Sequence, residues 1–153
     1  MIRRRLRTPT TVLVVAGALG LAACEDDPTG LEHTVPVGAE LVMNGATIAT
    51  FDAATGLWTG EMSVNEGDET PHISVHFLDE DDERITPDSD NYLEVVVDDE
   101  TIAEFEQDTP GEFGGHLHGI VQGETEVVFR FMHGAVGSGH SEFDTQAVVA
   151  RVN

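Results

Sequence analysis

Apolar residues in most of this chain come in short runs and not at helical spacing. From Val37 onward, these runs alternate with segments rich in Asn, Asp, Gly and Pro. Residues 73–77 alternate apolar with polar side chains, which is the period of a strand with one buried face. No stretch has a convincing helical period, so no helices are available to cover a parallel sheet. The pattern predicts an all-β fold, an antiparallel sandwich.

We expect roughly seven to nine short strands in this sandwich. The clearest turn is Asn44-Gly45, because Asn-Gly between two apolar runs is the strongest short-range signal of a hairpin. The expected strands cover residues 40–43, 47–51, 57–64, 73–77, 92–97, 101–105, 115–121, 126–133 and 145–152.

Residues 111–127 resemble the late strand pair of bacterial immunoglobulin-like domains. In that family a glycine and a short step precede Gly-x-Thr and an alternating strand, and the corresponding residues here are Gly119, Gly123, Thr125, Val127 and Phe129. The resemblance implies an immunoglobulin-like sandwich over residues 37–153 and implies nothing about function. Because the chain has one cysteine, the core must depend on burial of aromatic and aliphatic side chains. The aromatic ones are Phe51, Trp58, Phe77, Phe105, Phe113, Phe129 and Phe131.

The beginning of the chain has the pattern of an export signal. Arg3, Arg4, Arg5 and Arg7 precede an apolar run over 11–23, which is too short to span a bilayer. The run ends in Leu21-Ala22-Ala23-Cys24, which resembles the lipobox of bacterial lipoproteins. The resemblance implies a signal peptide over 1–23, cleavage before Cys24, and diacylglyceryl and acyl chains such as palmitate on that cysteine. An ordinary secretory signal and a retained anchor are the alternatives.

Charge changes sharply once the signal peptide is removed. The whole chain has a net charge of -22, and loss of the four leading arginines leaves three arginines against 29 acidic residues, a net charge of -26. We expect residues 24–36 to be a lipidated, acidic tether. Such a domain repels nucleic-acid backbones and anionic membrane surfaces, so the lipid on Cys24 must supply the attachment to the cell membrane or outer membrane.

Histidines late in the chain form a candidate metal site. His116 and His118 are two residues apart on an expected strand, so their rings point to the same face. Hairpin pairing of the neighbouring strands predicts that His118 comes close to His133 and His140, with Met132 nearby. Imidazole with a thioether suits copper or zinc.

Gly115-His116-Leu117-His118 also resembles a ligand stretch of copper-zinc superoxide dismutases, which are themselves immunoglobulin-like sandwiches. The resemblance implies that His116 and His118 are a ligand pair. The chain lacks the structural disulfide of those enzymes, and the sequence around His133 has no convincing counterpart of their zinc-site aspartate. The alternative is that the histidines are solvated surface residues, as we expect for His33, His72 and His76.

Acidic residues suggest a second kind of site. Asp79, Asp81, Asp88 and Asp90 lie in turns, where carboxylates in extracellular sandwiches hold calcium. The order of ligands in an EF-hand is missing, and a solvated charged turn is the alternative.

Catalytic motifs are scarce. The sequence has no Gly-x-Ser-x-Gly elbow and no lysine for a phosphate-binding loop. The sequence therefore favours a non-enzymatic, lipid-anchored extracytoplasmic module that binds or assembles with a partner. A copper- or zinc-binding protein is the alternative, and a dismutase-like metalloenzyme is a further one.

Overall fold

Eleven strands and the turns that join them make up residues 34–153, the part of the chain that the computed structural model describes. The predicted signal peptide over 1–23, Cys24, and the tether as far as residue 33 lie outside the described residues. Within 34–153 no helix occurs, so no helical segment there has the length and apolar character to cross a bilayer. The all-β class expected from the apolar runs is confirmed.

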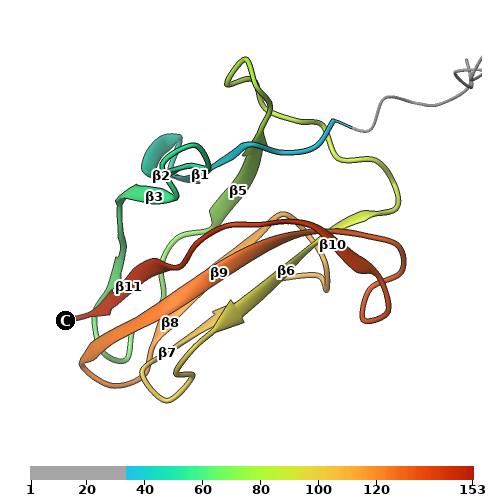
Figure 1. Cartoon of the computed structure of the whole chain (residues 1–153). Coiled ribbons are helices and arrows are strands. Elements are labelled where there is room, and N and C mark those ends of the chain that lie inside the picture. The colour runs from blue at the N-terminus through green and yellow to red at the C-terminus, as the bar shows by residue number, and fades with distance from the viewer. Residues whose placement is uncertain (1–33) are drawn as a thin grey trace, which may run out of the picture. The chain divides into compact units, whose positions relative to one another are not determined.

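The strands form two sheets that face each other across one core (Figure 1). The first sheet has the order β3-β2-β1-β5-β8-β7. Its strands are β1 (Gly38–Met43), β2 (Ala46–Asp52), β3 (Leu57–Gly60), β5 (Ile73–Leu78), β7 (Ala103–Glu106) and β8 (Gly114–Gly119). The second sheet contains β4 (Met62–Val64), β6 (Asn91–Val97), β9 (Gly123–His133), β10 (His140–Asp144) and β11 (Val148–Val152).

Strand β9 organises the second sheet. Figure 1 shows it running between β6 and β11, and its 11 residues are enough for two partners along one edge. Its first half pairs with β11 and its second half with β10, while β6 lies along the other edge. All of these pairings are antiparallel, whereas β4 and β11 form a parallel pair.

The structure contains more strands than the roughly seven to nine that were expected. The run 57–64 is divided between β3 and β4 at Gly60, whose φ of 97° turns the backbone out of the extended conformation. Strand β10 was not expected, because its sequence His-Ser-Glu-Phe-Asp lacks an apolar alternation. The Asn44-Gly45 hairpin is confirmed: both residues have positive φ, and Met43 pairs directly with Ala46.

Aromatic side chains from both sheets fill the core. Phe77 of the first sheet meets Phe131 of the second with ring centroids 5.1 Å apart. Phe129 is fully buried and contacts Trp58 and Phe105 edge-on. Such edge-to-face pairs add stability beyond the area they bury. Because alternate residues of each strand enter this core, the residues between them face outward, and these include most of the histidines.

Candidate functional site

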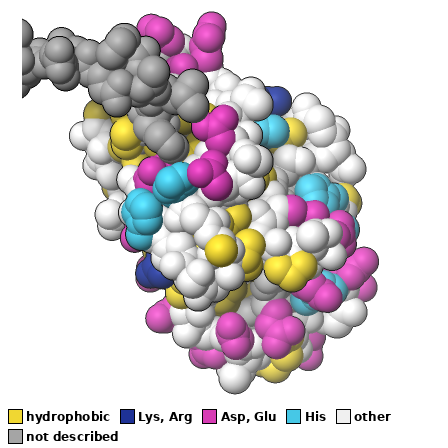
Figure 2. All heavy atoms as spheres, turned by 90° about the vertical axis from the view of Figure 1, so that its right-hand side faces the viewer, with side chains coloured by type: hydrophobic (Ala, Val, Ile, Leu, Met, Phe, Trp, Pro, Cys, Tyr) yellow, Lys and Arg dark blue, Asp and Glu magenta, His cyan; other side chains and the backbone are white. Residues whose placement is uncertain are grey.

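Histidine and acidic side chains adjoin one another on the surface of the sandwich (Figure 2). Within residues 34–153, two groups of at least three side chains bring one potential metal ligand atom each within 4.8 Å of the others. One group is His133, His140 and Glu142, and the other is His72, Asp108 and Glu112. We call the first group, together with Asp90, the β9–β10 cluster.

Strand pairing brings the two histidines of the β9–β10 cluster together. His133 ends β9 and His140 begins β10, and the register places them directly opposite each other. Their ring centroids are 5.4 Å apart, and the rings are nearly perpendicular. The register shifts between Ser141 and Phe143, a β-bulge at Glu142 that re-aims this part of the strand.

Asp90 fixes the orientation of His133. Its Oδ2 lies 2.7 Å from His133 Nε2, a hydrogen-bond distance between a carboxylate and an imidazole. A carboxylate that accepts from one ring nitrogen leaves the lone pair on the other nitrogen of a neutral imidazole. This arrangement, a carboxylate behind a histidine, is the usual support of a metal-binding imidazole.

The five residues of the predicted copper or zinc site lie on two sheets. His116 and His118 are on β8 of the first sheet, whereas Met132, His133 and His140 are on β9 and β10 of the second. No converging group within the described residues combines histidines from both sheets. Met132 is 7% exposed, and it points to the opposite face from His133 because successive residues of a strand alternate. The structure therefore forms no single site from this set.

His116 has a defined tautomer. Its Nδ1 lies 2.9 Å from the Thr70 carbonyl oxygen, and because a carbonyl only accepts, Nδ1 carries the hydrogen. Its Nε2 faces Asp108 Oδ1 at 3.7 Å. The hydrogen bond to Thr70 raises the pKa of His116 above the ordinary 6.5, with help from Asp108 and Glu69 and against the desolvation of the ring.

His118 lies between two carboxylates on the same outer face. Its Nε2 is 3.2 Å from Glu106 Oε2, and its Nδ1 is 3.6 Å from Glu69 Oε2. Glu106 comes from β7, and Glu69 comes from the segment before β5 and forms an isolated bridge with His118. His116 and His118 thus share a face, as their spacing predicts. Glu69 acts on both rings, whereas Asp108 contacts His116 and Glu106 contacts His118.

The carboxylates of the predicted calcium site have partners of other kinds. Asp79 accepts backbone hydrogen bonds from Asp81 and Glu83 and so closes its own turn. Asp90 contacts His133. Neither converging group found within residues 34–153 contains Asp79, Asp81 or Asp88.

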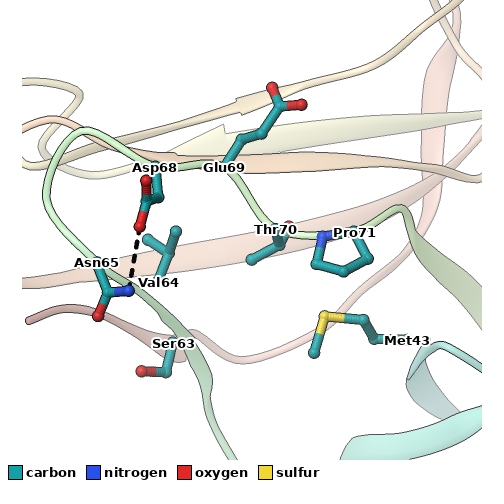
Figure 3. A pocket seen from close by; sticks show the side chains of 8 residues that line it. All are labelled: Met43, Ser63, Val64, Asn65, Asp68, Glu69, Thr70 and Pro71. Carbon is teal, nitrogen blue, oxygen red and sulfur yellow. Dashed lines mark hydrogen bonds between the residues drawn. The ribbon is translucent and has the colours of Figure 1, made fainter.

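A surface hollow of about 380 Å³ is lined in part by residues 68–71, the segment in which Glu69 forms a bridge with His118 of β8 (Figure 3). Met43, Val64 and Pro71 contribute apolar surface to it. Asn65 donates to Asp68 at 3.1 Å, and Figure 3 shows Glu69 pointing away from Met43. These polar groups stabilise the turn that carries them, so the histidine clusters are the stronger candidates for a site.

Sequence reasoning missed the acidic members of both groups. Glu142 enters the β9–β10 cluster at a bulge, which no residue pattern marks. The group of His72, Asp108 and Glu112 had a weak signal in Thr109-Pro110-Gly111, a turn sequence that brings the residues on either side of it together. His72, expected to be a solvated surface residue, is exposed but belongs to this group.

Comparisons with known proteins do not assign the chain to a family. No family model matches it, and no curated protein matches it. Among solved structures, domains 4 and 5 of the S-layer protein SbsC match with 16% identity and a TM-score of 0.44. That match covers 61% of this chain and 47% of the other, so the chain spans about half the length of that structure.

Proposed function

We propose that this chain is a bacterial lipoprotein whose β-sandwich is a non-enzymatic binding or assembly module outside the cytoplasm. The observation that carries the proposal is the order of its parts. An arginine-rich start, an apolar run and Leu21-Ala22-Ala23-Cys24 precede a sandwich that begins at Gly38 and has its own filled core. The sandwich offers its outer faces for contact with a partner.

Lipid is the physically reasonable means of attachment for this domain. Each buried methylene contributes about 0.8 kcal/mol, so two or three acyl chains anchor stably where one does not. The mature chain has three arginines and 29 acidic residues, and an anionic bilayer repels it. The lipid holds the amino terminus at the membrane while the charge keeps the sandwich in solvent.

Production of the full chain in a Gram-negative host tests the anchor. We expect the parent to incorporate labelled palmitate and to sediment with membranes, and the Cys24→Ser variant to do neither. An Ala23→Gly variant is the matched control, because it keeps a small residue before the cysteine and should still be labelled. Palmitate on Cys24→Ser, or an unlabelled parent, would contradict the proposal.

The β9–β10 cluster favours a second function, the binding of copper or zinc. Two imidazoles that bind one tetrahedral ion at about 2.0–2.1 Å have ring centroids about 5 Å apart. The centroids of His133 and His140 are 5.4 Å apart, and Glu142 supplies a carboxylate oxygen within reach. Asp90 contacts Nε2 of His133 and so orients the ring. The ligand atoms of His133, His140 and Glu142 lie within 4.8 Å of one another, so closing them to the roughly 3.3 Å of a tetrahedral site takes side-chain movements of about 1.5 Å or less.

Titration with Cu²⁺ and Zn²⁺ tests this second function, using full chain purified in detergent without chelators or a histidine tag. We expect the double variant His133→Gln, His140→Gln to lose one equivalent of metal or to bind it at least about tenfold more weakly. The variant His76→Gln is the control, since His76 lies outside the cluster. Unchanged affinity and stoichiometry in the double variant would contradict this function.

A further inference from the structure

A second pair of histidines lies side by side on the first sheet. His72 precedes β5, and His116 is on the outer face of β8. Their ring centroids are 5.5 Å apart at an interplanar angle of 81°. This separation is close to the roughly 5 Å expected when two imidazoles bind one tetrahedral ion.

Each of these histidines faces a carboxylate at nearly the spacing of metal ligands. His72 Nε2 is 3.6 Å from Glu112 Oε1, and His116 Nε2 is 3.7 Å from Asp108 Oδ1. Ligand atoms around a tetrahedral zinc ion are about 3.3 Å apart, given bonds of about 2.0–2.1 Å. Movements of a few tenths of an ångström would bring each pair to that distance. One ligand atom each from His72, Asp108 and Glu112 already lies within 4.8 Å of the other two, and His116 lies next to this group through its contact with Asp108.

The loop between β7 and β8 is braced where it carries both carboxylates. Gln107 Nε2 donates to the carbonyls of Leu93 and Glu112, and Gln107 Oε1 accepts from Gly111 N–H. The Asp108 N–H donates to Glu112 Oε1 at 3.1 Å, which ties the two acidic residues together. The carboxylates are therefore held by main-chain geometry as well as by their own rotamers.

The two rings are also held in place. Nδ1 of His116 donates to the Thr70 carbonyl oxygen, so its Nε2 has the lone pair that faces Asp108 when the ring is neutral. A backbone carbonyl behind one ring nitrogen is a common support for a metal-binding histidine. The His72 ring packs on Gly114, where an added Cβ would lie 2.4 Å from its Cε1.

We propose that His72, Asp108, Glu112 and His116 bind a divalent cation of the zinc class at a site separate from the β9–β10 cluster. Two imidazoles select against calcium and magnesium, which prefer all-oxygen sites. The side chains of His72 and Asp108 are 42% and 63% exposed, so an ion can enter directly from solvent. The site does not depend on lipidation or on metal binding at His133 and His140.

Zn²⁺ titration by calorimetry tests the site, with full chain purified in detergent and without a histidine tag. We expect the double variant His72→Gln, His116→Gln to lose one equivalent of zinc that the His133→Gln, His140→Gln variant retains. The control is again His76→Gln, a histidine on the same sheet. If the His72, His116 double variant binds zinc like the parent, the proposal is overturned, whichever way the β9–β10 variant behaves.

A measurement on the parent chain covers the case in which that variant does not fold. Nitrogen–proton correlation spectra of the imidazoles report which ring nitrogen binds an ion. We expect zinc to shift Nε2 of both His72 and His116 while Nδ1 of His116 keeps its hydrogen. Resonances of both rings that stay in place at saturating zinc would overturn the proposal.

Discussion

The side chain of His76 lies next to a cation as well as an acid. It is half-buried on β5, opposite Glu40 of β1, and Glu40 in turn forms an ion pair with Arg84. Burial lowers the pKa of His76 below the ordinary 6.5, and Arg84 lowers it further, while Glu40 acts in the opposite direction. The folded chain therefore resists the proton that the unfolded chain accepts.

This resistance predicts a pH effect on stability. As pH falls through about 6.5, His76 takes up a proton in the unfolded state before it does so in the folded state. Protonation therefore stabilises the unfolded state, and the free energy of unfolding decreases. We expect the His76→Gln variant to lose less stability than the parent between about pH 7.5 and 5.5. Urea unfolding of both chains at the two pH values measures the difference. Parallel losses in parent and variant would show that His76 has no such role.

Phe129 is a fully buried aromatic residue of the core. It is 0% exposed and lies between Trp58 and Phe105. We expect Phe129→Ala to lower the free energy of unfolding by about 3–5 kcal/mol, because the surrounding rings cannot fully close the cavity. Val136→Ala, at a side chain that is 56% exposed, should change it by less than about 0.5 kcal/mol. Chemical denaturation measures both, and similar losses would contradict this description of the core.

At the scale of elements, Gly60 separates two strands that the apolar pattern joins. It has a φ of 97°, and an added Cβ would lie 2.2 Å from the Ile48 carbonyl oxygen. Gly45, in the first hairpin, has a φ of 77° and open space around it. At both positions a residue with a Cβ would have a strained backbone. Only at Gly60 would the added Cβ also collide with neighbouring atoms.

These two positions form a matched pair. We expect Gly45→Ala to cost about 1–2 kcal/mol, the cost of a left-handed backbone for a residue with a Cβ. Gly60→Ala should cost clearly more, above about 2 kcal/mol, since the methyl group also collides with β2. Thermal unfolding compares them. Equal costs would mean that the close approach of Gly60 to Ile48 is not maintained.

The elements that the sequence predicts best are those whose pattern is local. The alternation in residues 73–77 and the Asn44-Gly45 turn depend on neighbouring residues, and both are found in the structure. Strand β10 was missed because pairing with β9, and not its own composition, makes it extended. Long-range pairing of this kind has no signature within the strand itself.

The candidate histidine clusters likewise combine features that follow from local sequence with features that depend on the fold. The facing of His116 and His118 follows from strand alternation, and the meeting of His133 and His140 follows from the short glycine-rich loop between them. Which sheet each pair joins depends on the order of strands in space, and the sequence does not show this order. The carboxylates that complete each cluster come from a bulge and from a braced loop, which form only in the fold.

At the scale of the whole molecule, charge is unevenly compensated. The three arginines of the described part all have acidic partners: Arg84 pairs with Glu40, Arg130 with Glu94, and Arg151 with Glu61 and Glu124. Most of the acidic residues have no arginine to offset them, since the sequence contains 29 acidic residues and only three arginines after residue 7. Repulsion among these carboxylates opposes the compact state.

This repulsion predicts that salt stabilises the protein. Screening shortens the reach of charge from about 30 Å at 0.01 M salt to about 8 Å at 0.15 M. We expect the unfolding temperature to rise by several degrees over that range of sodium chloride, a monovalent salt that leaves the histidine clusters without a divalent ion. A fall in the unfolding temperature would mean that the few arginine ion pairs outweigh the repulsion.

The intact mass of the protein extracted from the membranes of a bacterial host tests the central claim most directly. A lipid-anchored sandwich predicts a polypeptide that begins at Cys24 and carries the added mass of a diacylglyceryl group, with or without a further acyl chain. A polypeptide that begins at another residue, or an unmodified Cys24, would contradict the account.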